Sequence, residues 1–81
     1  MKVRVRLFAV AREAAGNDSV ELELPEQATI ALLRRRLVQR VPRLAALAGR
    51  LVFAVDREYA DDTMKIPPGA DVACIPPVSG G

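Results

Sequence analysis

The fold of this chain is decided by the stretch VELELPEQATIALLRRRLVQRVP, residues 20–42, in which the spacing of the apolar side chains changes. In its first part, apolar residues at positions 20, 22 and 24 alternate with two glutamates. A period of two is typical of a strand with one buried face, and Pro25 ends it. In its second part the apolar spacing becomes three and four, which indicates an amphipathic helix. The stretch therefore predicts a strand followed by a helix.

The predicted helix is bounded by residues that suit its two ends. Thr29 is the candidate N-cap, because its side-chain oxygen can accept a hydrogen bond from the first turn. Pro42 ends the helix, since proline cannot continue the hydrogen-bond ladder. The apolar stripe of the helix consists of Ile30, Leu33, Leu37 and Val41.

The arginines of this helix form the richest basic run in the chain. At 100° per residue, Arg35, Arg36 and Arg40 point away from the apolar stripe. Arg34 lies at the edge of the stripe, where its methylene stem can cover apolar surface. We interpret the run 34–36 as a solvated helix face rather than a phosphate-binding stripe.

The segments on either side of this stretch complete an α+β domain. Residues 3–7 alternate as a first strand, whose Arg4 and Arg6 are predicted to share the outer face with the glutamates of the second strand. A helical turn over 11–15 stops at Gly16, and a further turn over 44–48 is closed by Gly49. Further strands are expected at 51–55, at 59–60 and at 71–75, with turns at 56–58 and 67–69.

This element order predicts a ubiquitin-like β-grasp fold, with a mixed sheet of four to five strands and one main helix packed on one face. In such a fold the first and last strands lie side by side in the middle of the sheet. We expect one domain over residues 1–75 and an extended tail over residues 76–81.

Composition excludes several classes of function. The 81 residues carry a net charge of +2, which is too small to predict nucleic-acid binding. No apolar run approaches the roughly 20 residues that span a bilayer, and the alternating start lacks the apolar core of a signal peptide. We therefore expect a cytoplasmic protein with no membrane partner. With one cysteine and no histidine, we expect no metal site.

The tail, PPVSGG, has the properties of a segment that presents its terminal carboxylate for a reaction. Pro76 and Pro77 stiffen its root, because proline has a fixed φ. Val78, Ser79 and Gly80 become progressively smaller, so that the end of the chain can pass through a narrow channel in another protein. Gly81 offers an unhindered terminal carboxylate, which needs activation, as an acyl-adenylate, before anything can be attached to it.

The whole chain resembles the small subunits of molybdopterin synthases. The most specific matches are Phe8-Ala9, Arg12-Glu13, Gly16, Gly69, Asp71-Val72-Ala73 and the run from Pro76 to Gly81. In that family a ubiquitin-activating-like adenylyltransferase uses ATP and magnesium to adenylate the terminal glycine, and a sulfur donor protein converts it to a thiocarboxylate. The large subunit then receives the tail and transfers the sulfur to cyclic pyranopterin monophosphate during molybdenum cofactor biosynthesis.

Applied to this chain, the resemblance implies that Gly81 carries the sulfur and that Gly80 allows the tail to be inserted. It implies no permanently bound cofactor and no catalytic base. The chain is then no enzyme by itself but the sulfur-donating subunit of a heteromeric sulfurtransferase. The family usually has aromatic residues just before the two prolines, whereas this chain has Cys74-Ile75, a difference that affects the partner surface more than the chemistry.

A docking patch is predicted beside the root of the tail. If Val72 and Cys74 face the helix, then Ile75 faces the outer side of the sheet, where Phe8 of the adjacent first strand also points. Tyr59 is a third candidate for this exposed cluster.

Three alternatives stay open at this point. Cys74 could relay sulfur, but a lone cysteine on an inner face with no histidine beside it is typically a small core residue. The chain could carry sulfur for thiamine, cysteine or transfer-RNA thiolation. It could also be a non-catalytic ubiquitin-like binding module with an inert tail.

Overall fold

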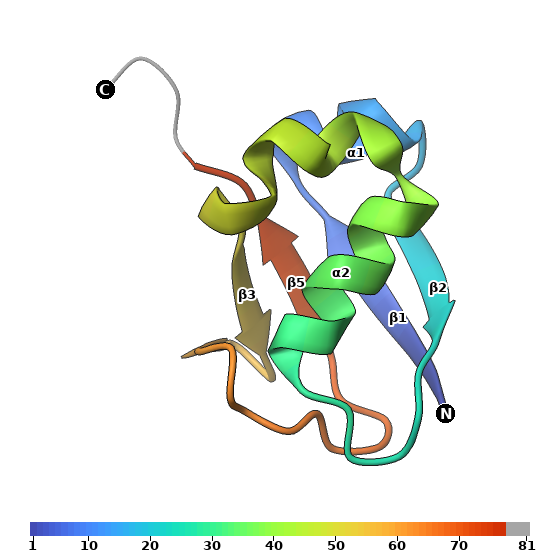
Figure 1. The fold of residues 1–81 in the computed structure, drawn as a ribbon, viewed down its shortest axis with the longest axis vertical. Helices are drawn as coiled ribbons and strands as arrows, with labels where there is room; N and C mark the ends of the chain where they lie inside the picture. The colour runs from blue at the N-terminus through green and yellow to red at the C-terminus, as the bar shows by residue number, and fades with distance from the viewer. Residues whose placement is uncertain (78–81) are drawn as a thin grey trace.

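The structure, a computed structural model, describes residues 1–77. Its elements are β1 (Lys2–Leu7), α1 (Ala9–Ala15), β2 (Ser19–Glu23), α2 (Ile30–Arg40), the 3-10 helix η1 (Pro42–Arg50), β3 (Val52–Val55), β4 (Glu58–Ala60) and β5 (Val72–Ile75). The strands form one sheet in the order β2-β1-β5-β3-β4, and α2 crosses one face of it (Figure 1). The predicted β-grasp arrangement is confirmed.

The middle of the sheet is formed by the first and last strands. β1 pairs with β5 in parallel and with β2 antiparallel, so that β5 is the central strand of the five. Arg4 lies opposite Glu21 as predicted, whereas Arg6 lies opposite Ser19. Arg6 instead forms a bidentate ion pair with Asp71 at 2.9 Å, because the parallel neighbour brings that carboxylate to its other side.

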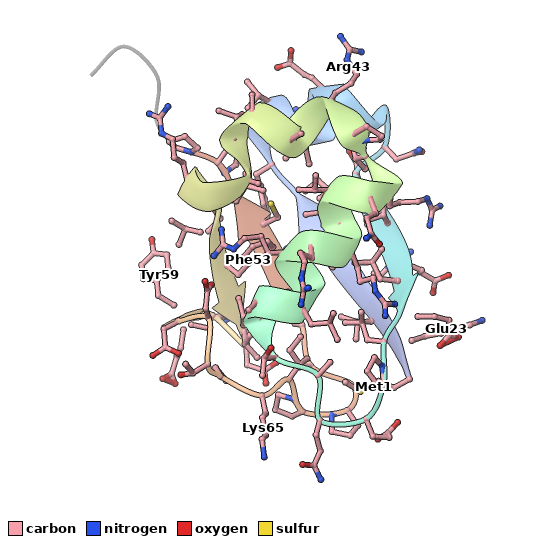
Figure 2. All side chains as sticks on the ribbon, viewed as in Figure 1. Met1, Glu23, Arg43, Phe53, Tyr59 and Lys65 are labelled. Atoms are coloured by element: carbon pink, nitrogen blue, oxygen red, sulfur yellow. The ribbon has the colours of Figure 1, made fainter. Side chains whose placement is uncertain are left out.

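The core lies between α2 and the inner face of the sheet. Ile30, Leu33 and Leu37 are fully buried, as the apolar stripe predicts, and Val41 is 6% exposed. Phe53 of β3 is also fully buried and lies between β3 and α2 in Figure 2. The N-cap prediction is confirmed, since the Leu32 N–H donates to the Thr29 hydroxyl oxygen at 3.3 Å.

The turns agree with the sequence except at Glu58, which begins β4 instead of belonging to the turn before it, and at the end of η1. Gly16 ends α1 with φ 74°, and a two-residue turn at Asp56 and Arg57, both at positive φ, joins β3 to β4. Gly49, however, does not close a turn, because η1 continues through Arg50. Within the described part of the chain, no helix is long and apolar enough to cross a membrane.

The arginine run has structural roles that the sequence did not predict. Arg35 is exposed, as expected of a solvated face. The Arg36 and Arg40 guanidinium groups, however, donate to the main-chain oxygens of Glu23 and Glu21 at 3.2 and 3.1 Å. These oxygens belong to the edge strand β2, whose free backbone groups would otherwise be open to another strand. Two of the arginines therefore cover a sheet edge.

The strand boundaries at the end of the chain differ by one residue from the predicted ones. β5 begins at Val72 rather than at Asp71, and β3 begins at Val52 rather than at Leu51. The Asp71 N–H donates to the Asp56 side chain at 2.9 Å, and the Leu51 oxygen accepts from Arg34 at 2.7 Å. Both residues therefore bond to side chains at the points where the strands start.

Candidate functional site

The candidate site lies where β5 ends and the chain leaves the sheet. Ile75 and Pro77 are half-buried and Pro76 is buried, so the root of the tail packs on the domain. The Phe8 N–H donates to the Cys74 oxygen at 3.3 Å, which holds the end of β1 beside the end of β5. The predicted tail residues Val78, Ser79, Gly80 and Gly81 lie outside the described residues, and the predicted boundary after Ile75 stays a prediction.

The predicted docking residues meet around a shallow hollow on the sheet face opposite α2. Phe8, Tyr59 and Ile75 all line it, together with Arg6, Ala54, Arg57, Asp71 and Ala73. Val72 and Cys74 are fully buried on the inner side, so the predicted alternation along β5 is correct. Tyr59, whose register the sequence left open, lies opposite Ala54 on β3, is 78% exposed and projects from the body (Figure 2). The role of the three residues in docking stays a prediction.

An ion pair that the sequence analysis did not identify organises this hollow. Arg6 and Asp71 pair across β1 and β5 with side chains about half exposed. The Arg6 guanidinium carbon also lies 5.5 Å from the centre of the Phe8 ring, within the range of a cation–π contact. Phe8 is therefore held in place by its neighbour. The pair could have been predicted from the expected parallel pairing of the first and last strands, because this pairing puts residues 6 and 71 close together on one face.

Cys74 does not have the environment of a sulfur relay. Its side chain is fully buried, and burial raises the pKa of its thiol to about 11, although the charge of Arg34 opposes the shift. A thiol with so high a pKa stays protonated at neutral pH, where the thiolate is the nucleophile. Cys74 is therefore a small apolar residue of the core.

We expect native Cys74 to react with iodoacetamide at pH 7 at least about 100-fold more slowly than in urea, because reaction requires opening of the core. The same burial makes stability fall with alkaline pH. Because the pKa of Cys74 is raised in the folded protein, the thiol of the unfolded chain ionises first as the pH rises. The free energy of unfolding is therefore at its full value below the ordinary pKa range of a thiol, and it declines as the pH rises toward about 11. Mass spectrometry measures the first effect and urea midpoints the second. Fast alkylation of the folded protein, or the same alkaline decline in Cys74→Ala, would contradict the prediction.

Among residues 1–77, no three side chains of the metal-binding kinds lie together as a potential metal site. The described residues also show no buried acid/base pair, since no buried side chain among them is polar or charged. What the site offers is an exposed apolar surface around the base of the tail.

The sheet order, the single layer of helices and the exit at the central strand define a ubiquitin-like β-grasp domain. The chain belongs to the ThiS family, whose match covers residues 5–81.

Relatives and solved structures agree with this assignment over the full length. The molybdopterin synthase sulfur carrier subunit of Homo sapiens is 34% identical over 83 residues, covering 99% of this chain and 94% of that protein. The putative molybdopterin converting factor subunit 1 of Pyrococcus furiosus has a TM-score of 0.84 at 29% identity, covering 96% of this chain and 99% of that one. The SAMP1 protein of Haloferax volcanii has a TM-score of 0.86 at 26% identity, and each chain is covered completely.

Proposed function

We propose that this chain is the sulfur carrier subunit of a molybdopterin synthase. The family match reaches residue 81, and the relatives named above include a molybdopterin synthase sulfur carrier subunit. The observation that supports the proposal most directly is the place of the tail root, at the end of the central strand and beside an exposed apolar surface. A carrier needs this combination, since a partner must hold the domain while its active site receives the tail.

The proposed chemistry takes place at the carboxylate of Gly81. A ubiquitin-activating-like adenylyltransferase joins this carboxylate to the α-phosphate of ATP, with magnesium, and pyrophosphate leaves. Sulfide-level sulfur from a donor protein then attacks the acyl carbon, AMP leaves, and a thiocarboxylate is formed. In the large subunit this sulfur is given to cyclic pyranopterin monophosphate. The catalytic groups belong to the partners, and this chain supplies the activated end and its placement.

The reach of the tail follows from where the domain holds it. Because Pro76 is buried and Pro77 half-buried, four residues beyond Pro77 are available to enter a partner. Four extended residues span at most about 14 Å. Gly80, with no side chain, and the small Ser79 and Val78 are proposed to occupy the channel, and the partner must therefore bring its active site close to the domain surface.

Intact-mass measurement tests the proposal. We expect the chain, incubated with the adenylyltransferase, ATP, magnesium and a sulfur donor, to gain the mass difference of one oxygen replaced by sulfur. Fragmentation should place that difference on Gly81. Omission of ATP is the control and should leave the mass unchanged. An unchanged mass in the complete mixture would refute the function as a sulfur carrier.

A second candidate keeps the same chemistry and changes the recipient. Membership of the ThiS family favours a sulfur carrier in general, and a thiocarboxylate at Gly81 would also serve thiamine, cysteine or transfer-RNA thiolation. Incubation of the thiocarboxylated chain with the large subunit and cyclic pyranopterin monophosphate separates the two. Loss of the sulfur from the carrier, with formation of molybdopterin, supports the first candidate, whereas retention of the sulfur favours the second.

A further inference from the structure

The large apolar side chains that are exposed in residues 1–77 are not scattered. They are Phe8, Val10, Val52 and Tyr59, with exposed fractions of 42, 44, 42 and 78%. Single exposed apolar residues are normal on a protein surface, but a contiguous group indicates a contact surface. All four line grooves that border the root of the tail.

Two grooves flank the tail root, one on each side. The first is lined by Phe8, Ala9 and Val10 at the junction of β1 and α1, by Leu47 and Arg50 of η1, and by residues 75–77. The second is lined by Val52, Tyr59 and the same residues 75–77. Because Ile75, Pro76 and Pro77 form a wall of both grooves, the two are parts of one surface. We call Phe8, Val10, Leu47, Val52 and Tyr59, arranged around residues 75–77, the collar.

The backbone fixes the side of the collar formed by Phe8 and Val10 before a partner binds. Ala9 has a φ of 50°, a left-handed conformation that a non-glycine residue adopts at a cost of about 1 kcal/mol or more. This residue separates Phe8, which directly follows β1, from Val10, in the first turn of α1. Phe8 is held further by its N–H bond to Cys74 and by the Arg6 guanidinium. A surface fixed before binding loses less entropy on association.

We propose that the collar is the surface on which the tail-accepting large subunit seats the mouth of its channel, through an apolar rim that carries an acidic side chain opposite Arg50. The inference rests on the proposed function and extends it, because the docking surface then continues from the outer sheet face onto α1 and η1. A partner that takes in the residues after Pro77 must lie against both grooves, since the tail root is their common wall. Apolar groups at the centre of an interface are the usual source of its affinity.

Arg50 determines which charge we expect on this partner. Arg50 is exposed, lines the first groove, and takes part in no ion pair within residues 1–77. A guanidinium group that is covered by a partner without a counter-charge would weaken the complex, because a buried unpaired charge is costly. A carboxylate on the rim removes this cost and also fixes the orientation of the partner.

The first test introduces a charge into the collar. We expect Val10→Asp to raise the Kd for the large subunit at least about tenfold, as measured by isothermal titration. An aspartate in the first turn of a helix favours the helix, so the variant should stay folded. Gln39→Asp is the matched control, since it adds the same charge at an exposed position of α2 outside the collar, and it should bind within about twofold of the wild type. On the other side of the tail, Val52→Thr keeps the shape of the side chain and should weaken binding about threefold or more.

The second test examines the charge. Arg50→Glu should raise the Kd about tenfold at low salt, and the difference from wild type should shrink as salt screens the repulsion. If both Val10→Asp and Val52→Thr bound the large subunit with the Kd of the wild type, the collar would be rejected as the docking surface, even if Gly81 is thiocarboxylated normally. Failure of the wild type both to bind the large subunit and to gain sulfur would instead overturn the proposed function, and the assignment of the partner with it. A loss of affinity in Arg50→Glu that does not change with salt would overturn only the acidic side chain proposed for the rim.

Discussion

Deletion of Gly81 is expected to lower sulfur loading and sulfur transfer by at least about 100-fold while it leaves binding to the large subunit almost unchanged. The shortened chain still ends in a glycine, so the loss arises from position rather than from steric hindrance. One residue fewer places the acyl carbon about 3.5 Å short of the reacting groups. Because Pro76 is buried, the root of the tail cannot simply detach from the domain to make up that distance.

Binding and chemistry must be measured on the same samples. Isothermal titration against the large subunit should give a Kd within about threefold of the wild type, because the collar lies on residues that the deletion leaves intact. Intact mass should show little or no thiocarboxylate. A control that appends one glycine after Gly81 shifts the acyl carbon in the opposite direction and should also be poorly loaded.

The same measurement separates a carrier from a binding module. In a binding module with an inert tail, the full-length chain would show no sulfur loading at all, so the deletion would have nothing to remove. In a carrier the full-length chain loads and the shortened chain does not. Full loading of the shortened chain would contradict the assignment of the acyl chemistry to Gly81.

The fold was predictable from the sequence wherever local spacing decides the outcome. The period-two alternation in β1 and β2, the stripe of α2 with Thr29 before it, and the left-handed Gly16 each depend on neighbouring residues. The length of η1 was not predictable, because a 3-10 helix that continues through Gly49 depends on what its end contacts. That contact comes from Arg34, which donates to the main-chain oxygen of Ala48 from another helix.

The site was predictable in part for the same reason. Phe8 and Ile75 follow from alternation once β1 and β5 are placed side by side. Val10 and Leu47 do not, because they meet only where a short helix and a 3-10 helix approach the tail root. The pairing of Arg6 with Asp71 spans 65 residues of sequence and depends on the sheet order. Contacts of this kind need the topology before they can be assigned.

Replacement of Arg34 by alanine is expected to lower the free energy of unfolding by about 3 kcal/mol. The Arg34 Nη1 donates to the oxygens of Ala48 at 2.6 Å and Leu51 at 2.7 Å, and Nη2 donates to Asp62 at 2.7 Å. Its guanidinium also lies 5.2 Å from the centre of the buried Phe53 ring. The buried Nε has no partner, which offsets part of this gain, and the Asp62 contact adds little because that side chain is 55% exposed.

The two main-chain oxygens account for most of the expected loss. A charged donor removed from a partly buried acceptor costs about 1.5–3 kcal/mol, and the space left over Phe53 adds to it. For a domain of this size, about 3 kcal/mol lowers Tm by roughly 12–24 °C. Arg34→Lys should recover only part of the loss, because one ammonium group cannot reproduce the planar fork.

Arg35→Ala is the matched control, since Arg35 neighbours Arg34 on α2 but is exposed. We expect this control to change the free energy of unfolding by no more than about 0.5 kcal/mol in urea. Arg34 ties α2 to the end of η1 and to the start of β3, and these segments carry Leu47, Arg50 and Val52 around the tail root. Arg34→Ala should therefore also weaken binding to the large subunit at temperatures where the domain is still folded. Equal urea midpoints for the two variants would show that the three hydrogen bonds of Arg34 do not stabilise the domain.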